Sequence, residues 1–173
     1  GSLLSATVFT YDENGNLASF TNAAGETESF VYDRFGRPIV TRHPLGQVTS
    51  LKYTHFKDPD RVIFPDGAER NAVRNGVGLL THAINELGDV TEFFYDSSGR
   101  PLGSADEMGN RSTLVYQDNR VVQSVDPLGR VTRFEYDQRN LLTAIIDPTG
   151  GVVDRVYDEL GRLIEQTNQI GQT

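Results

Sequence analysis

The 173-residue chain has no cysteine and no tryptophan, and its only lysines are Lys52 and Lys57. The lack of cysteine excludes disulfides, thiolate metal sites and a cysteine nucleophile, although it leaves the compartment open because secreted proteins without cysteine are common. The net charge of −8 and the scarcity of lysine argue against a phosphate backbone as partner, so we expect no nucleic-acid binding. No apolar run approaches the ~20 residues of a membrane span.

What the sequence does contain is an internal repeat with a period of about 21 residues. Its tyrosines recur at this period, apart from one slightly shorter spacing and one double spacing that passes over Arg74. A glycine precedes nearly every position of this tyrosine row at a constant distance. Because Gly67 keeps this distance to Arg74, the Arg74 unit is a degenerate repeat in register. The repeats begin near Tyr11, Tyr32, Tyr53, Arg74, Tyr95, Tyr116, Tyr136 and Tyr157.

Each period carries two turn signals. One is Tyr-Asp-x-x-Gly-Arg, as at residues 32–37, and the other is Asp-Pro-x-Gly, as at residues 126–129. An aspartate can accept a hydrogen bond from the backbone two residues on, glycine tolerates a positive φ, and proline presets φ at the first central position of a turn. Two turns in each period delimit two strands.

The segments between the turns fit extended chain. In residues 131–136 the alternation places Thr132, Phe134 and Tyr136 on one face of a strand. No long window keeps a helical period without Gly or Pro. We therefore predict an all-β fold in which tandem hairpins form a long curved antiparallel sheet, with like aromatic residues aligned across neighbouring strands.

The repeats also set the expected domain organisation. We interpret residues 1–5, which start with Gly1-Ser2, as a tag scar and leader, and residues 6–173 as one array of about eight repeats. Nothing in the sequence resembles a polar cap at either end of the array. Open edge strands invite pairing with another copy, so we expect self-association through the sheet edges.

The combination of Tyr-Asp-x-x-Gly-Arg-Leu, Asp-Pro-x-Gly and an aromatic strand resembles the YD repeat of the Rhs family. The resemblance covers roughly residues 6–171, and it departs at the Arg74 unit and at a few turn positions: Thr54, Lys57, Asn75, Arg120 and Asn140. It implies a section of the hollow β-shell that is formed in bacterial Rhs toxins, in the C component of insecticidal toxin complexes and in teneurins. In the bacterial members the shell encloses a C-terminal toxin.

The resemblance implies a non-catalytic function, with a toxin domain of the same parent protein as partner and secretion or delivery to a target cell as the setting. An extracellular adhesion or ligand-binding module, like the repeat region of teneurins, is the alternative. The family's self-cleaving aspartyl protease segment has no counterpart here, because Asp126-Pro127 and Asp147-Pro148 lie in repeat register with further repeats after them.

Several segments have part of the pattern of a known site, but we predict no catalytic, cofactor or metal residues. Asp12-Glu13-Asn14-Gly15-Asn16 has part of the calcium-loop pattern, but position 12 of an EF-hand loop would be Ala23, which favours an ordinary turn. Carboxylate pairs such as Asp126 with Glu135 or Asp147 with Asp154 occur in every repeat and are explained by turns.

The sequence also does not support a site for nucleophilic catalysis or for nucleotide binding. The histidines, which are His43, His55 and His82, come without a Gly-x-Ser-x-Gly elbow, and the glycine-rich residues 75–79 lack the Lys-Ser/Thr of a phosphate loop. We predict that residues 75–79 form the distorted turn of the weakest repeat. Aromatic ladders can bind carbohydrate, but the same side chains are needed to pack the sheet.

Overall fold

The computed structural model describes residues 6–169, and every regular element in that range is a β-strand. The chain divides into two compact units, of which the first ends at Val90 and the second begins at Thr91. The first unit contains β1 (Val8–Tyr11), β2 (Leu17–Thr21), β3 (Thr27–Tyr32), β4 (Pro38–Arg42), β5 (Val48–Lys52), β6 (Arg61–Ile63), β7 (Glu69–Arg74) and β8 (Leu80–Ile84). From the boundary onward lie β9 (Val90–Tyr95), β10 (Pro101–Ala105), β11 (Arg111–Gln117), β12 (Arg120–Val125), β13 (Val131–Tyr136), β14 (Leu142–Ile146), β15 (Val152–Tyr157) and β16 (Leu163–Gln169).

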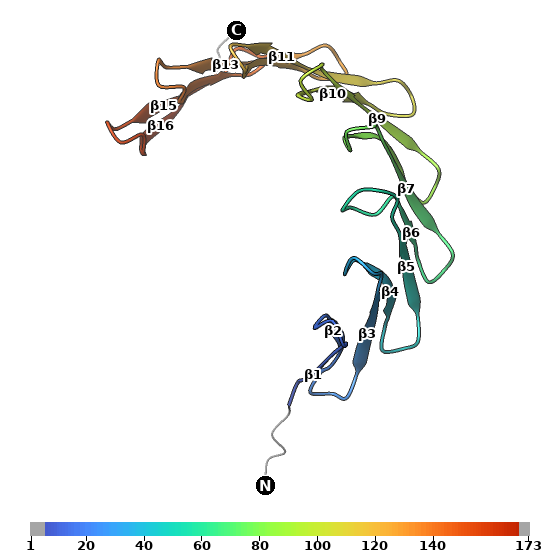
Figure 1. The fold of residues 1–173 in the computed structure, drawn as a ribbon. Helices are drawn as coiled ribbons and strands as arrows, with labels where there is room; N and C mark the ends of the chain where they lie inside the picture. The colour runs from blue at the N-terminus through green and yellow to red at the C-terminus, as the bar shows by residue number, and fades with distance from the viewer. Residues whose placement is uncertain (1–5, 170–173) are drawn as a thin grey trace. The chain divides into compact units, whose positions relative to one another are not determined.

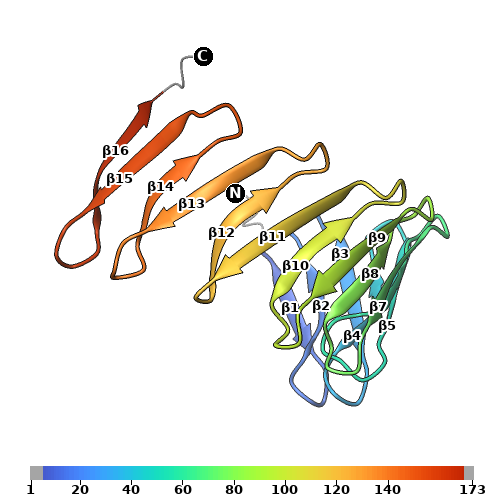
Figure 2. The same ribbon diagram turned by 90° about the horizontal axis from the view of Figure 1, so that it is seen from above.

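Within each unit, consecutive strands pair antiparallel in chain order (Figure 1). The strands on either side of each turn that follows the tyrosine position form a hairpin, from β1–β2 in the first unit to β15–β16 in the second. Figure 2 shows β13, β14, β15 and β16 lying side by side. The predicted all-β fold of tandem antiparallel hairpins is confirmed.

Hairpins are joined to one another by shorter ladders than those inside them, except at the hairpin β5–β6, which itself pairs at only three positions. The hairpin β15–β16 pairs at six positions, whereas β14 and β15, which belong to different hairpins, pair at three. The same three-position ladder joins β2 to β3 and β12 to β13. In each case pairing lies beside the Asp-Pro-x-Gly turn or its equivalent and stops before the tyrosine end of the strands, so backbone groups there need other partners.

Within each unit the described strands form one sheet without a second layer packed on it. Ala144 is the only buried apolar side chain among the described residues, with 7% of its surface exposed, and none of their large side chains is fully buried. The stability of each unit therefore rests on the backbone ladder and on contacts between neighbouring strands rather than on a closed core.

The predicted alternation of faces agrees with the burial of β13. Thr132, Phe134 and Tyr136 are half-buried, while Arg133 and Glu135 are exposed. Phenylalanines align across strands as expected, since the rings of Phe9, Phe20 and Phe30 follow one another with centroids 6.5 Å apart at each step. The tyrosines have a different role.

Candidate functional site

The turn after each tyrosine is closed by its aspartate. At residues 33–37, Asp33 Oδ1 accepts hydrogen bonds from the backbone N–H of Phe35 (2.8 Å) and of Arg37 (3.0 Å). The backbone closes with Gly36 N to Asp33 O at 3.0 Å, and Gly36 has a φ of 75°, which a side chain would strain. This is a type I turn followed by a glycine bulge, in which aspartate and glycine have the predicted roles.

The second turn of the period has the same construction. Asp147 Oδ1 accepts from the N–H groups of Thr149 (2.7 Å) and Gly151 (2.9 Å), and Gly150 has a φ of 90°. The hydroxyl of Thr149, together with these backbone donors, lowers the pKa of Asp147. A general acid needs the opposite shift, so the geometry of this carboxylate fits a turn cap.

Residues 75–79 were expected to be distorted, and they are not. Asn75 Oδ1 accepts from the N–H groups of Val77 (3.1 Å) and Leu79 (3.0 Å), which is the regular arrangement with asparagine in the place of aspartate. That prediction is wrong because an amide oxygen caps the turn as a carboxylate does. The irregular loop lies one repeat earlier, between Tyr53 and Asp60.

Asp12 also caps a turn. Its Oδ1 accepts from the N–H groups of Asn14 (2.9 Å) and Asn16 (2.8 Å), and its Oδ2 accepts from the Asn16 side chain (2.9 Å). Both oxygens of the suspected calcium loop thus face N–H donors. Among the residues that the structure describes, no group of three or more His, Asp or Glu side chains is placed to hold a metal ion.

The tyrosine hydroxyls join each hairpin to the one before it. Tyr136 donates to the carbonyl of Val121 (2.9 Å) and Tyr157 to the carbonyl of Leu142 (2.9 Å). The equivalent contact with the preceding hairpin is made by Tyr32, Tyr53 and Tyr116. Each bond satisfies a carbonyl at the end where the ladder between hairpins has stopped, which explains why the position favours tyrosine over phenylalanine.

Arginines join four of the described turns in the tyrosine row to the next one. Arg37 pairs with Asp33 in its own turn (Nη2 to Oδ2, 2.7 Å) and donates from Nη1 to the carbonyl of Phe56 (2.8 Å). Its guanidinium also lies 4.4 Å from the centroid of the Tyr53 ring. Arg100 repeats this arrangement, with Asp96 at 2.6 Å and Asn119 at 2.9 Å.

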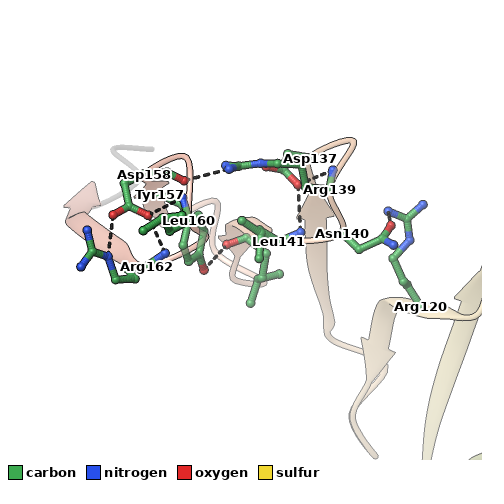
Figure 3. Close-up of polar contacts among 10 residues, drawn as sticks. Arg120, Asp137, Arg139, Asn140, Leu141, Tyr157, Asp158, Leu160 and Arg162 are labelled. Carbon is green, nitrogen blue, oxygen red and sulfur yellow. Dashed lines mark hydrogen bonds and ion pairs between the residues drawn. The ribbon is translucent and has the colours of Figure 1, made fainter.

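We call this row of contacts the seam. It consists of Tyr32, Arg37, Tyr53, Arg100, Tyr116, Arg120, Tyr136, Arg139 and Tyr157. Figure 3 shows its last part, where Arg120 reaches Asn140 (2.8 Å) and Arg139 reaches the carbonyl of Asp158 (2.8 Å). The seam lies at the tyrosine end of the strands and supplements the short backbone ladders.

At the position where Arg74 replaces the tyrosine, ion pairs take the place of the tyrosine hydroxyl bond. Arg74 lies 3.5 Å from Asp60 and 3.8 Å from Asp58, and only 14% of its side chain is exposed. Asp60 in turn accepts hydrogen bonds from the N–H and the hydroxyl of Thr54, both at 2.7 Å. These bonds join the last residue of the irregular loop to its first. Thr54 and Arg74, which both depart from the repeat, are therefore linked through Asp60.

The histidines lie in separate surroundings. His43 contacts Glu28 (3.1 Å) and Thr49 (3.1 Å), His82 contacts the hydroxyl of Thr81 (3.1 Å), and His55 belongs to the irregular loop. Within residues 6–169 no helix is long and apolar enough to cross a membrane.

Two family descriptions match the sequence. The family described as Teneurin YD-shell matches residues 2–125, and the family described as RHS Repeat matches residues 116–152. The first match covers more than half of the chain.

Relatives and solved structures agree with these matches. Double-stranded DNA deaminase toxin A of Burkholderia cenocepacia is 28% identical over 151 residues, which are 87% of this chain and 10% of that protein. Toxin protein Tse5 of Pseudomonas aeruginosa is 29% identical over 147 residues, which are 78% of this chain and 10% of that protein. The chain thus spans about a tenth of the length of these relatives.

A crystal structure of TcdB2-TccC3 without its hypervariable C-terminal region has the same fold. The TM-score is 0.63 at 14% identity, over 96% of this chain and 12% of the other. At that identity the similarity concerns the fold alone.

Proposed function

The chain belongs to the teneurin YD-shell family of Rhs/YD-repeat proteins, and on that premise we propose that it is a section of β-shell wall that encloses a toxin polypeptide of the same parent protein. The observation that carries the proposal is the seam, because its contacts recur between successive hairpins. A sheet that is joined in this way extends by adding repeats, and its laterally paired backbone forms a barrier.

Containment needs no catalytic group in the wall. The aspartates that a hydrolase would use, such as Asp126 and Asp147, accept the N–H groups of their own turns. We propose that the chain is not an enzyme and that the enclosed polypeptide is held by weak contacts. Secretion, or delivery to a target cell, is the setting that this function requires.

Protease protection of the full-length parent protein tests the containment. The segment that follows the repeats should resist trypsin in the intact protein and become digestible when Arg100 and Arg120 are both replaced by alanine, because these arginines hold the seam. Replacement of exposed Arg133 by alanine is the control and should leave the protection intact. Equal digestion of the segment in the intact protein and as an isolated peptide would refute containment.

The proposal that the chain is not an enzyme is tested by replacing aspartates with asparagine. Asn22 and Asn85 show that an amide caps this second turn of the period, so Asp126→Asn combined with Asp147→Asn should keep the fold while removing both carboxylates. Loss of a hydrolytic activity from the parent protein, with an unchanged circular dichroism spectrum, would refute the proposal.

The alternative is an extracellular adhesion or ligand-binding module. Exposed apolar residues at the tips of turns favour it, since they are available to a partner: Leu45, Leu87, Met108 and Leu128. Binding of the purified chain to cells, or to carbohydrate through its aromatic ladder, would support this alternative. A variable domain encoded directly after the repeats would support the toxin shell.

A further inference from the structure

The irregular loop between Tyr53 and Asp60 is the place where the repeat departs most from its pattern. Other turns of the tyrosine row close within a few residues, but this loop extends at the expense of β6, which has three residues. The next repeat keeps its register, so the added loop length replaces strand. The residues that form the loop do not follow the Asp-x-x-Gly-Arg pattern of the repeat.

The loop and the preceding turn line a surface cavity of about 560 Å³ that is open to solvent, within the first unit. This volume is within the range of small-molecule sites. Three cations line the cavity, namely Arg34 and Arg37 from the turn and Lys57 from the loop, and His55 lies beside them. Positive charge is concentrated here, in a chain whose net charge is −8.

Two of these cations have no carboxylate partner. Arg37 is occupied by Asp33 and by the carbonyl of Phe56, so it belongs to the wall of the cavity. Within residues 6–169, Arg34 and Lys57 form no ion pair. The nearby Asp58 faces Arg74 at 3.8 Å. The cavity therefore has two positive charges that are not held in an ion pair, although Asp33 and Asp58 lie near them.

The remaining walls are aromatic. Phe35 is 66% exposed and lies under both arginines, with the guanidinium of Arg34 at 4.6 Å from its centroid and that of Arg37 at 5.3 Å. Phe56 is held in place from the other side, since a Cβ at Gly78 would meet its ring at 2.9 Å. A ligand in the cavity would find flat apolar surfaces next to the two cations that form no ion pair.

We propose that this cavity binds a doubly charged oxyanion attached to a flat aromatic ring, that is, an aryl phosphate or a close analogue. Arg34 offers a forked guanidinium and Lys57 a point charge for the oxyanion, while Phe35 and Phe56 contact the ring. The proposal is independent of the wall function, because the cavity lies within one unit and does not involve an enclosed polypeptide.

Titration of the 173-residue chain with phenyl phosphate, followed by two-dimensional NMR, tests the site. We expect a Kd on the order of 1 mM, as suits a small fragment, with shifts confined to residues 33–37 and 53–60. Inorganic phosphate should bind about tenfold more weakly because it lacks the ring, and benzyl alcohol should cause no saturable shifts because it lacks the charge. Equal affinity for phenyl phosphate and inorganic phosphate would overturn the aromatic part of the proposal.

The two lysines of the chain provide a matched pair of variants. Lys57→Gln, and separately Arg34→Gln, should weaken phenyl phosphate binding about tenfold. Lys52→Gln removes the same charge from β5, outside the cavity, and should leave the affinity unchanged. Each variant must keep the dispersed spectrum of the parent chain. If Lys52→Gln weakens binding as much as Lys57→Gln does, or if neither matters, the site is not where we place it.

Discussion

A single hydroxyl group distinguishes tyrosine from phenylalanine, and in this repeat that group has a fixed partner. The hydroxyl of Tyr136 donates to the carbonyl of Val121, which lies beyond the end of the ladder between β12 and β13. Without the hydroxyl, this half-buried carbonyl would lose its protein partner. The tyrosine thus stabilises the junction between hairpins.

Tyr136→Phe should lower the free energy of unfolding by about 1 kcal/mol, which is the usual net value of such a hydrogen bond. Urea denaturation measures it. Tyr11→Phe is the matched control, because Tyr11 is 64% exposed and the described residues include no earlier hairpin for it to contact. Equal losses in the two variants would contradict the assigned role of the hydroxyl.

The capping aspartates make stability dependent on pH. The side chain of Arg100, with backbone donors, holds the pKa of Asp96 below its usual 3.8. A depressed pKa in the folded state stabilises the fold above the unfolded value, and this stabilisation is lost as the pH falls through the lower folded value. We expect the urea midpoint to fall below about pH 4. Asp96→Asn should keep the cap and remove only the share of this dependence that Asp96 contributes, because other capping aspartates also have lowered pKa values. An unchanged pH profile would refute the role of the Asp96 carboxylate.

At the scale of elements, the strand β10 contains a glycine that the period does not require. Gly103 lies in the bulge opposite β9, with a φ of 149°, and a Cβ there would meet the carbonyl oxygen of Ser112 on β11 at 2.0 Å. The turn glycines could be predicted from the repeat. Gly103 lies outside both glycine positions, and close approach of two backbones leaves no other mark in the sequence.

Gly103→Ala should therefore destabilise the second unit by at least about 2 kcal/mol, since the backbone of β11 would have to move. Gly76→Ala is the control, because nothing lies within 4 Å of a Cβ there. That variant should stay within about 0.5 kcal/mol of the parent chain. Thermal or urea unfolding measures the free energy of unfolding of both variants. A small loss for Gly103→Ala would show that the backbone of β11 can move to make room for the Cβ without a measurable loss of stability.

At the scale of the whole molecule, the sequence predicts the hairpins but not what joins them. Tyrosine and glycine spacings locate the turns, and the shortened spacing between Tyr116 and Tyr136 is explained by the tight turn of Asp118 and Asn119, which have φ of 47° and 67°. The seam could not be predicted, because Tyr136 and Arg139 bond to backbone carbonyls, which every residue has. The organisation of residues 6–173 as one array stays a prediction.

The ends of the described sheet lead to the last prediction. Among residues 6–169, β1 pairs with β2 alone and β16 with β15 alone, so each has one unpaired edge. Apolar side chains on these strands are open to solvent, with Phe9 54% and Ile164 63% exposed. An unpaired edge with exposed apolar residues is a template for another strand, so we expect the chain to self-associate as its concentration rises.

Sedimentation velocity over a range of concentrations measures this association. Phe9→Lys combined with Ile164→Lys should weaken it, because charges on an edge strand oppose pairing with another edge. Leu128→Lys is the matched control, since Leu128 is 77% exposed but lies at the tip of a turn rather than on an edge strand. If Leu128→Lys weakens association as much, the contact runs through the turns, and a monodisperse monomer at high concentration would exclude both routes.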